Sequence, residues 1–304
     1  MPEQIEAVLQ LVPALRDKQV RVTSLSGGIT NRNYRLDADG ESYVLRIGGE
    51  NAALLGIDRA CEHACAVAAA AYGIGPEVLA FLPEHDALIT RFVSGRILAP
   101  CDMQSVPTLR RAVEALRRFH DGSPVPGVFS PFTTIREYYE LAQGSPKGRP
   151  VSFPNMIDQA MDWMRRIEES LQTGEPPCPC HNDLLPANFI DDGGSVWIID
   201  WEYAGMGDRF FDLGNLAVNN QFDAEHEQLL LELYFGEVRP DHLRRLHLMR
   251  LISDLREALW GFLQSGISTL DFDFQGYGQA HLKRFLEAAA SDSQSTPRFL
   301  RARA

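Results

Sequence analysis

Two short segments carry most of the information in this chain: HNDLLPAN at residues 181–188 and VWIID at residues 196–200. In the first, Asp183 and Asn188 lie five positions apart in a polar stretch. In the second, Asp200 ends an apolar β-run that follows a Gly-Gly turn. Phosphoryl transfer needs a carboxylate to orient the attacking hydroxyl and oxygen ligands to hold Mg²⁺ against a polyphosphate. The spacing predicts that Asp183 faces the hydroxyl and that Asn188 and Asp200 bind the metal.

The pattern H-x-D-x(4)-N, followed by a strand that ends in Asp, is typical of the catalytic loop and metal-binding Asp of protein-kinase-like folds. Any one of these residues alone would more simply cap a turn. The complete set favours phosphoryl transfer over a capping role. We therefore predict an α+β fold with two lobes, of the protein-kinase-like type.

The first 93 residues predict a small antiparallel sheet that carries one internal helix. A short amphipathic helix at residues 3–16 precedes them, and a turn at residues 37–40 separates the first two β-runs. The predicted sheet strands are 20–36, 42–47, 77–82 and 87–93, and the internal helix is 58–72. We expect residues 1–93 to form the N-terminal nucleotide-binding lobe.

From residue 94 onward the pattern becomes mostly helical. The predicted helices are 105–119, 134–142, 155–171, 225–235, 241–265 and 275–290. We expect residues 94–304 to form a larger lobe that carries the catalytic and acceptor-binding residues. A cleft between two such lobes is a natural place for a small ligand.

Composition excludes several classes of function. The 304 residues carry 29 Lys and Arg against 41 Asp and Glu, a net charge of -12. Such a charge repels nucleic acid and anionic membrane surfaces, so neither is an expected partner. The N-terminus lacks a secretory signal, and five cysteines are an odd number for a disulfide framework. We expect a cytoplasmic protein, and the oligomeric state stays open.

Two upstream features fit a nucleotide site. Backbone N–H groups of the segment Ser26-Gly27-Gly28-Ile29-Thr30-Asn31, between two β-runs, could cover phosphates, although a Gly-Gly pair alone is usually only a hairpin turn. Arg46, in the run YVLR, occupies the place of the strand-borne Lys of kinases and keeps its positive charge. Glu62, on the Ala-rich helix, is the natural partner of Arg46; taken alone it would read as an exposed helical residue.

Together these features make the chain resemble the choline/ethanolamine kinases, within the aminoglycoside-phosphotransferase-like group of small-molecule kinases. The most specific part is DWEYA at residues 200–204, followed by FDLGN at residues 211–215. The resemblance spans nearly the whole chain. Its other stretches are 27–31, 43–47, 57–62, 75–76, 181–188 and 259–277.

The resemblance implies roles for individual residues. Asp183 would be the catalytic base, Asn188 and Asp200 the Mg²⁺ ligands, and Arg46 a ligand of the ATP phosphates, held by Glu62. The run 89–93, which contains Arg91 and Val93, would connect the lobes and bind adenine through its backbone. Glu202 could either join the metal site or brace the loop, and Asp212 is expected to brace the loop.

The acceptor end departs from the family pattern. Choline kinases hold a quaternary ammonium against aromatic faces and carry two Trp residues on a late helix. Trp260 matches one of these two Trp residues, although it could equally be a core residue. Glu257 stands where the other Trp is expected. Phe222 and Phe285 are further candidate aromatics. A carboxylate at position 257 suits an ammonium that has N–H donors, without excluding choline.

We therefore predict an ATP- and Mg²⁺-dependent kinase that phosphorylates the hydroxyl of choline or ethanolamine. One alternative is a kinase for another cationic hydroxyl compound, such as an aminoglycoside or thiamine. Another is a non-catalytic nucleotide-binding pseudokinase, which the intact set of Asp183, Asn188 and Asp200 disfavours. The physiological acceptor and the pathway are not encoded in any pattern of the sequence.

Overall fold

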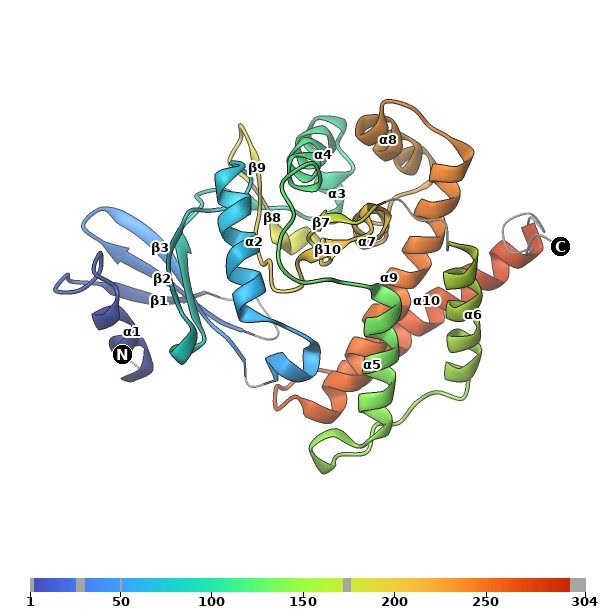
Figure 1. The fold of residues 1–304 in the computed structure, drawn as a ribbon, viewed down its shortest axis with the longest axis horizontal. Helices are drawn as coiled ribbons and strands as arrows, with labels where there is room; N and C mark the ends of the chain where they lie inside the picture. Colours follow the sequence, from blue (N-terminus) through green and yellow to red (C-terminus); the bar gives the residue numbers. More distant parts are fainter. Residues whose placement is uncertain (1–2, 26–30, 50, 172–175, 296–304) are drawn as a thin grey trace.

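The computed structural model describes residues 3–25, 31–49, 51–171 and 176–295 of the chain. An antiparallel sheet near the N-terminus is followed by a mostly helical region that holds the C-terminus (Figure 1). The predicted α+β class is confirmed. The two regions meet along helix α2 and the short strands β6 to β10, where Glu62, Asp183, Asn188 and Asp200 also lie.

Five strands form the N-terminal sheet, in the order β1-β2-β3-β5-β4 with every neighbour antiparallel. Asp39 and Gly40 join β2 to β3 with φ angles of 52° and 83°, the left-handed pair that a two-residue hairpin requires. The predicted β-run 20–36 is divided between two strands. The strands are β1 (Arg21–Leu25), β2 (Arg32–Ala38), β3 (Glu41–Ile47), β4 (Val78–Leu82) and β5 (Ala87–Arg91).

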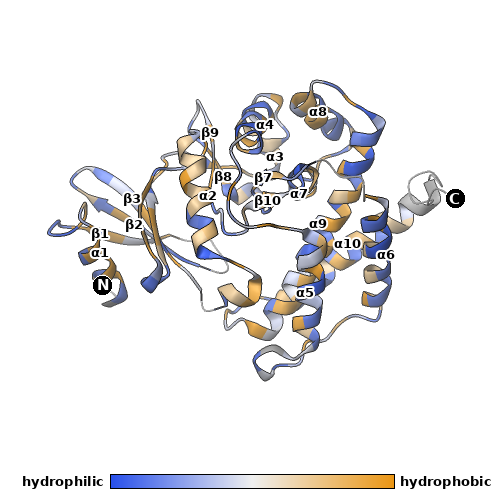
Figure 2. Cartoon of the chain, viewed as in Figure 1, coloured by the Kyte–Doolittle hydropathy of each residue, from blue (hydrophilic) through white to orange (hydrophobic). Residues whose placement is uncertain are grey.

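Two helices pack with this sheet. Helix α1 (Glu3–Leu11) buries Ile5 and Val8 in a small core that includes Leu45 of β3. Helix α2 (Arg59–Ala71) begins at Asp58, whose carboxylate accepts backbone hydrogen bonds from the first turn. Figure 2 shows α2 as largely apolar, and its buried face belongs to the main core of the C-terminal region. Helix α2 therefore ties the sheet to the rest of the molecule.

Helix α9 lies at the centre of the C-terminal region. Every residue from 251 to 264 on this helix is buried, because α5, α7 and α10 pack around it. Outer helices such as α6 are largely hydrophilic in Figure 2. The helices are α3 (Pro100–Met103), α4 (Val106–His120), α5 (Pro131–Gln143), α6 (Ile157–Ser170), α7 (Arg209–Asn219), α8 (Ala224–Phe235), α9 (Pro240–Ile267) and α10 (Phe274–Ser295).

Five very short strands frame the segment that contains the predicted catalytic residues. Strand β8 pairs with both β6 and β9, and β7 pairs with β10. Their bounds are β6 (Arg96–Ile97), β7 (Cys178–Cys180), β8 (Phe189–Asp191), β9 (Val196–Ile198) and β10 (Gly205–Gly207). The loop 181–188 therefore begins at the end of one strand pair and ends at the start of another.

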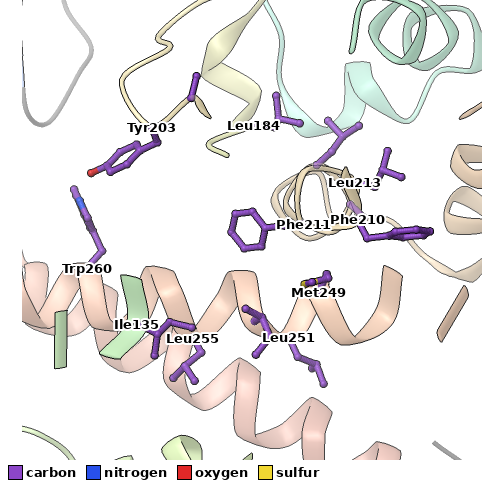
Figure 3. Close-up of a cluster of buried hydrophobic side chains, with 14 of the residues drawn as sticks. Ile135, Leu184, Tyr203, Phe210, Phe211, Leu213, Met249, Leu251, Leu255 and Trp260 are labelled. Carbon is purple, nitrogen blue, oxygen red and sulfur yellow. The ribbon is translucent and has the colours of Figure 1, made fainter. Parts of the chain in front are cut away.

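The main core joins α7 to α9. Figure 3 shows Phe210 and Phe211 of α7 above Met249 and Leu251 of α9, while Trp260 lies at one end of the same cluster. Helix α7 was not predicted from the sequence, whereas each of the six predicted C-terminal helices corresponds to a helix in the structure. In the described part of the chain, no helix has both the length and the apolar character needed to cross a bilayer.

Candidate active site

The loop that carries Asp183 is held by Asp212 of helix α7. The backbone N–H groups of His181 and Asn182 donate to the Asp212 carboxylate at 2.7 and 2.6 Å. His120 of α4 lies 3.0 Å from the same carboxylate through Nε2 and 2.6 Å from the Tyr234 hydroxyl through Nδ1. Asp212 is completely buried, so its contacts are with the loop and not with solvent.

A second residue of α7 supports the same loop. The backbone N–H of Leu184 donates to the Asn215 side chain. The Asn215 amide in turn donates to the Ser253 hydroxyl of α9 at 2.9 Å. Because α7 contacts both the loop and α9, the position of Asp183 depends on how these two helices pack.

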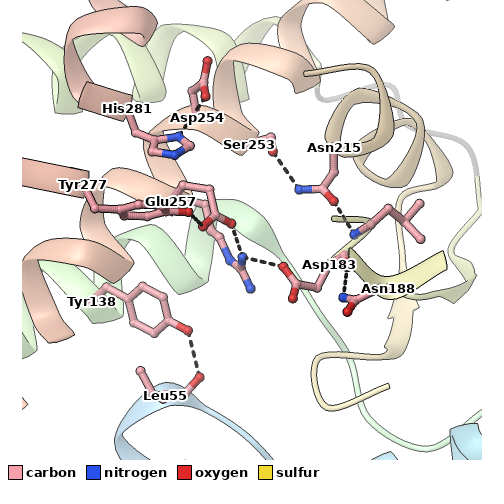
Figure 4. Close-up of polar contacts among 12 residues, drawn as sticks. Leu55, Tyr138, Asp183, Asn188, Asn215, Ser253, Asp254, Glu257, Tyr277 and His281 are labelled. Atoms are coloured by element: carbon pink, nitrogen blue, oxygen red, sulfur yellow. Dashed lines mark hydrogen bonds and ion pairs between the residues drawn. The ribbon is translucent and has the colours of Figure 1, made fainter. Parts of the chain in front are cut away.

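Asp183 and Asn188 are joined within the loop. The Asn188 Nδ2 atom donates to the backbone oxygen of Asp183 at 2.8 Å, as Figure 4 shows. This bond uses the nitrogen side of the amide and leaves its oxygen for another ligand. Burial raises the pKa of Asp183 to about 7; Arg256 opposes this shift, and the charges of Glu257 and Glu202 add to it.

Asp200 lies beside Asn188 because β8 and β9 form a hairpin. Phe189 pairs with Ile198, and the Ile199 N–H donates to the Asn188 carbonyl at 3.0 Å. Asp200 has a φ of 67°, and its Oδ1 atom is buried with no hydrogen-bond partner among the described residues. Burial, then the charges of Glu202 and other nearby groups, raises the Asp200 pKa well above its usual range. A carboxylate in this position is suited to a cation.

Arg46 and Glu62, which the sequence predicts as a pair, belong to a network of charged side chains. Arg46 Nη2 lies 2.8 Å from the Glu62 carboxylate, and both side chains are almost fully buried. Arg59 Nη1 contacts Glu62 at 2.9 Å and Glu202 at 3.2 Å, and Asn31 Nδ2 donates to Glu202 at 2.9 Å. The network therefore joins β3 and α2 to the segment after β9. The partners of Glu202 include Arg59 and Asn31, contacts that a bracing role for this residue would use.

The other predicted nucleotide-binding residues have different surroundings. Ser26, Gly27, Gly28 and Thr30 lie outside the described residues. The side chain of Arg91 is exposed at the end of β5, where it pairs with Glu41 and, at 3.2 Å, with Glu77. These contacts occupy the guanidinium. The backbone of residues 89–91 pairs with β3 and β4, and the Phe92 N–H donates to the Ser42 carbonyl, so Val93 is the part of this run whose backbone could bind adenine. Val93 is half-buried just after β5.

On the acceptor side, the structure brings Asp183 and Glu257 together through Arg256. Arg256 Nη1 lies 3.1 Å from Asp183 Oδ1 and also donates to Glu257 Oε1. The Tyr277 hydroxyl donates to Glu257 Oε2 at 2.7 Å (Figure 4). Glu257 is buried, so it does not project into solvent as an isolated helical carboxylate would. This chain of contacts makes Glu257 a neighbour of the predicted base.

Aromatic rings surround the same cluster. The Arg256 guanidinium carbon lies 4.4 Å from the centre of the Tyr203 ring. Trp260 is 8% exposed and packs edge-on against Phe274 and Tyr277, with ring centres 5.8 and 5.6 Å apart. Trp260 therefore belongs both to the core and to the border of the site.

Two of the aromatics predicted for the acceptor site, Phe222 and Phe285, are buried side chains. Phe222 follows α7 and stacks on His226 with ring centres 5.6 Å apart. Phe285, on α10, is completely buried in the core and has no surface to offer a ligand. Only the aromatic character of these two positions suggests a role in ligand binding. Burial in the core explains that character equally well.

Sequence reasoning missed Arg256 and Arg59 as site residues. Arg256 stands directly before Glu257 in LISDLREALWGFL, residues 251–263, where most of the other residues are apolar, and this was the available signal. A cavity of about 240 Å³ borders the site at Tyr203 and Glu202. The remaining lining residues are Leu55, Gly56, Asp58, Cys61, Gly127, Val128, Phe129, Ser130, Thr133, Thr134, Glu137 and Ala204.

Comparisons with known proteins place this geometry in a family. The phosphotransferase enzyme family matches residues 21–248. Ethanolamine kinase 2 of Mus musculus is 27% identical, over an alignment that covers 94% of this chain and 81% of the relative.

Solved structures agree with this match. A choline/ethanolamine kinase family protein from Mesorhizobium loti is 31% identical, has a TM-score of 0.81, and is aligned over 98% of this chain and 96% of its own. The choline kinase LicA from Streptococcus pneumoniae has the same fold at 22% identity, with a TM-score of 0.80 over 95% and 100% of the two chains. The chain therefore belongs to the phosphotransferase enzyme family, with the protein-kinase-like fold and the similarity to choline/ethanolamine kinases that its sequence predicts.

Proposed function

We propose that this protein transfers the γ-phosphoryl group of ATP to the hydroxyl of a small amino alcohol, choline or ethanolamine, in a Mg²⁺-dependent reaction. One observation carries the proposal: Asp183 and Glu257 bind the same nitrogen of Arg256. A base for a hydroxyl and a carboxylate for an ammonium are therefore both within hydrogen-bond distance of one nitrogen atom. This proximity suits a molecule in which a short carbon chain joins the two groups.

Asp183 would accept or orient the proton of the attacking hydroxyl. Its pKa of about 7 suits a base that acts near neutral pH, where it can take a proton and release it again. The loop braces at Asp212 and Asn215 hold the carboxylate in place, so little reorganisation is needed when the acceptor binds.

Asn188 and Asp200 would hold the Mg²⁺ ion. The fit rests on the unpartnered buried Oδ1 of Asp200 and on the amide oxygen of Asn188, which the bond to Asp183 leaves available. Carboxylate and amide oxygens are the hard ligands that this ion prefers. When bound, the ion would neutralise charge on the phosphate oxygens.

Arg46, held by Glu62, would contact the nucleotide phosphates, and the backbone of Val93, in the run 89–93, would bind adenine. The buried ion pair supports the first role because it fixes the guanidinium at the boundary of the two regions. The second role is a prediction from the family pattern alone.

An ADP-release assay over a series of hydroxylated amines tests the proposal. We expect turnover with ethanolamine or choline that depends on Mg²⁺ and yields a phosphomonoester detectable by mass spectrometry. Turnover with an aminoglycoside or thiamine alone would favour a kinase for another cationic hydroxyl compound. Nucleotide binding without turnover on any acceptor would favour a pseudokinase.

A further inference from the structure

One edge of the Arg256 guanidinium makes no hydrogen bond to any described residue. The Arg256 side chain is 2% exposed, and its Nη1 atom makes both of its ion pairs, to Asp183 and Glu257. The other two nitrogens, Nε and Nη2, are buried and have no hydrogen-bond partner among the described residues. Buried donors without partners are uncommon in folded proteins, and each lost hydrogen bond is costly.

The two unpartnered nitrogens are on the same side of the guanidinium. The Nε–H and one Nη2–H bond are nearly parallel, and this edge matches the two oxygens of a carboxylate. The Tyr203 ring, whose centre lies 4.4 Å from the guanidinium carbon, occupies one of the flat faces. The edge formed by Nε and Nη2 is therefore the part of Arg256 whose hydrogen bonds a ligand could complete.

The charges of the cluster account for the ammonium group of a ligand, and the Nε and Nη2 donors of Arg256 account for a carboxylate. Two buried carboxylates, Asp183 and Glu257, face one guanidinium, so there is room for one further positive charge. A ligand that carries only a cation would bring that charge close to Arg256 without using its donors. A ligand that carries an ammonium and a carboxylate would satisfy both Glu257 and Arg256.

We propose that Arg256 binds a carboxylate of the acceptor, so that the preferred substrate is a hydroxylated amine that also carries a carboxylate. This inference rests on the proposed function, phosphoryl transfer to the hydroxyl of a small amine, and adds a carboxylate to the preferred acceptor. The acceptor hydroxyl oxygen would form a bond to the γ-phosphorus as the bond from that phosphorus to the β,γ-bridging oxygen breaks. The hydroxyl proton would pass to Asp183, and ADP would leave.

Three acceptors test the inference because they differ at one substituent. Ethanolamine has no further oxygen, 2-amino-1,3-propanediol adds a hydroxymethyl group, and serine adds a carboxylate at the same carbon. We expect kcat/KM for serine to exceed that for ethanolamine by about tenfold or more, with the diol between them, because hydrogen bonds to charged groups are the stronger ones.

Arg256→Lys keeps the positive charge between the two carboxylates and removes the two-pronged edge. We expect the kcat/KM ratio of serine to ethanolamine to fall by about 10- to 100-fold in this variant. Tyr277→Phe is the matched control: it removes a hydrogen bond from the far side of Glu257, and should lower kcat/KM for both compounds by the same factor.

A wild-type protein that prefers ethanolamine to serine overturns the inference and leaves the proposed function intact. An unchanged serine-to-ethanolamine ratio in Arg256→Lys also overturns it. Absence of ADP release with all three compounds, and with choline, overturns the proposed function itself. If Arg256→Lys does not fold by circular dichroism, the wild-type comparison of the three acceptors still decides the matter.

Discussion

Asp183 is a buried carboxylate that we do not assign as a metal ligand. Its proposed role therefore differs from that of Asn188 and Asp200, which we assign to the metal. The Asp183 carboxylate pairs with Arg256, and the backbone carbonyl of the same residue accepts a hydrogen bond from Asn188. A carboxylate of this kind contributes to the reaction of the acceptor and not to the affinity for the nucleotide.

We expect Asp183→Asn to lower kcat by about 10²–10⁴-fold or more while ATP·Mg²⁺ still binds. The amide keeps the size of the side chain but cannot take the proton. Steady-state turnover and calorimetric titration of the nucleotide measure the two effects separately. Asp158→Asn, at an exposed position of α6, is the control and should leave both unchanged. Wild-type turnover in Asp183→Asn would remove this residue from the mechanism.

In the proposed function, Glu257 would distinguish ammonium groups by their N–H donors. A carboxylate hydrogen bond to a charged donor contributes about 1.5–3 kcal/mol, whereas a lost cation–π contact costs a trimethylammonium about 0.5–2 kcal/mol. Both effects favour a primary amine over choline. We therefore expect wild-type kcat/KM to be higher for ethanolamine than for choline.

Glu257→Trp should shift that ratio toward choline by about tenfold or more, because it removes the carboxylate and restores an aromatic wall. Glu257→Gln is the matched control, since it removes the charge without adding a ring, and should lower the ethanolamine rate without raising that of choline. Equal ratios in wild type and Glu257→Trp would mean that this position lies outside the acceptor pocket.

The residue types and their spacing were sufficient to predict Asp183, Asn188, Asp200 and the pair of Arg46 and Glu62 as candidates. These residues stand at fixed positions relative to predicted strands and helices, so local pattern is informative. The partner of Asp183 could not be predicted in the same way. Arg256 is 73 residues from Asp183 in the sequence, and only the crossing of α9 beneath the loop brings them together.

At the scale of elements, α7 is the helix that positions the loop, and it was missed from the sequence. Its residues 211–215 read as a family motif, and a Gly in the middle of this short segment weakens the helical signal. The structure explains the Gly: a Cβ atom at Gly214 would lie 2.7 Å from backbone atoms of Met249 and Arg250 on α9. The close approach of α7 and α9 therefore requires glycine at position 214.

We expect Gly214→Ala to destabilise the protein by about 1–3 kcal/mol, because the added methyl group forces α7 away from α9. Urea denaturation followed by circular dichroism measures the change. Gly144→Ala is the matched control: its φ is -70° and its added Cβ would have neighbours no closer than 3.5 Å. The control should be neutral or slightly stabilising. Equal loss of stability in both variants would contradict the packing argument.

At the scale of the whole molecule, the site is assembled from both regions. Arg46 and Glu62 come from β3 and α2, and Asn188 and Asp200 come from the ends of the β8–β9 hairpin. Arg59 joins the two regions through its contact with Glu202. A nucleotide bound between them would therefore meet a positive group from one side and metal ligands from the other.

We expect Asp200→Ala and Asn188→Ala to weaken nucleotide binding in the presence of Mg²⁺ and to have little effect in its absence. The reason is that both oxygens are assigned to the metal and not to the nucleotide itself. Calorimetric titrations of ATP with and without Mg²⁺ measure this dependence. A variant that retains the metal dependence of the wild type would show that its residue is not a ligand.

The central claim is that this protein moves a phosphoryl group from ATP to the hydroxyl of a small amino alcohol. The most direct test is to incubate it with γ-³²P-labelled ATP, Mg²⁺ and, separately, ethanolamine, choline and serine, and to follow the label. The account predicts that the label appears in a phosphomonoester of at least one of these acceptors, and not when Asp183 is replaced by Asn. Label released only as inorganic phosphate, or retained on ATP with every acceptor, would contradict it.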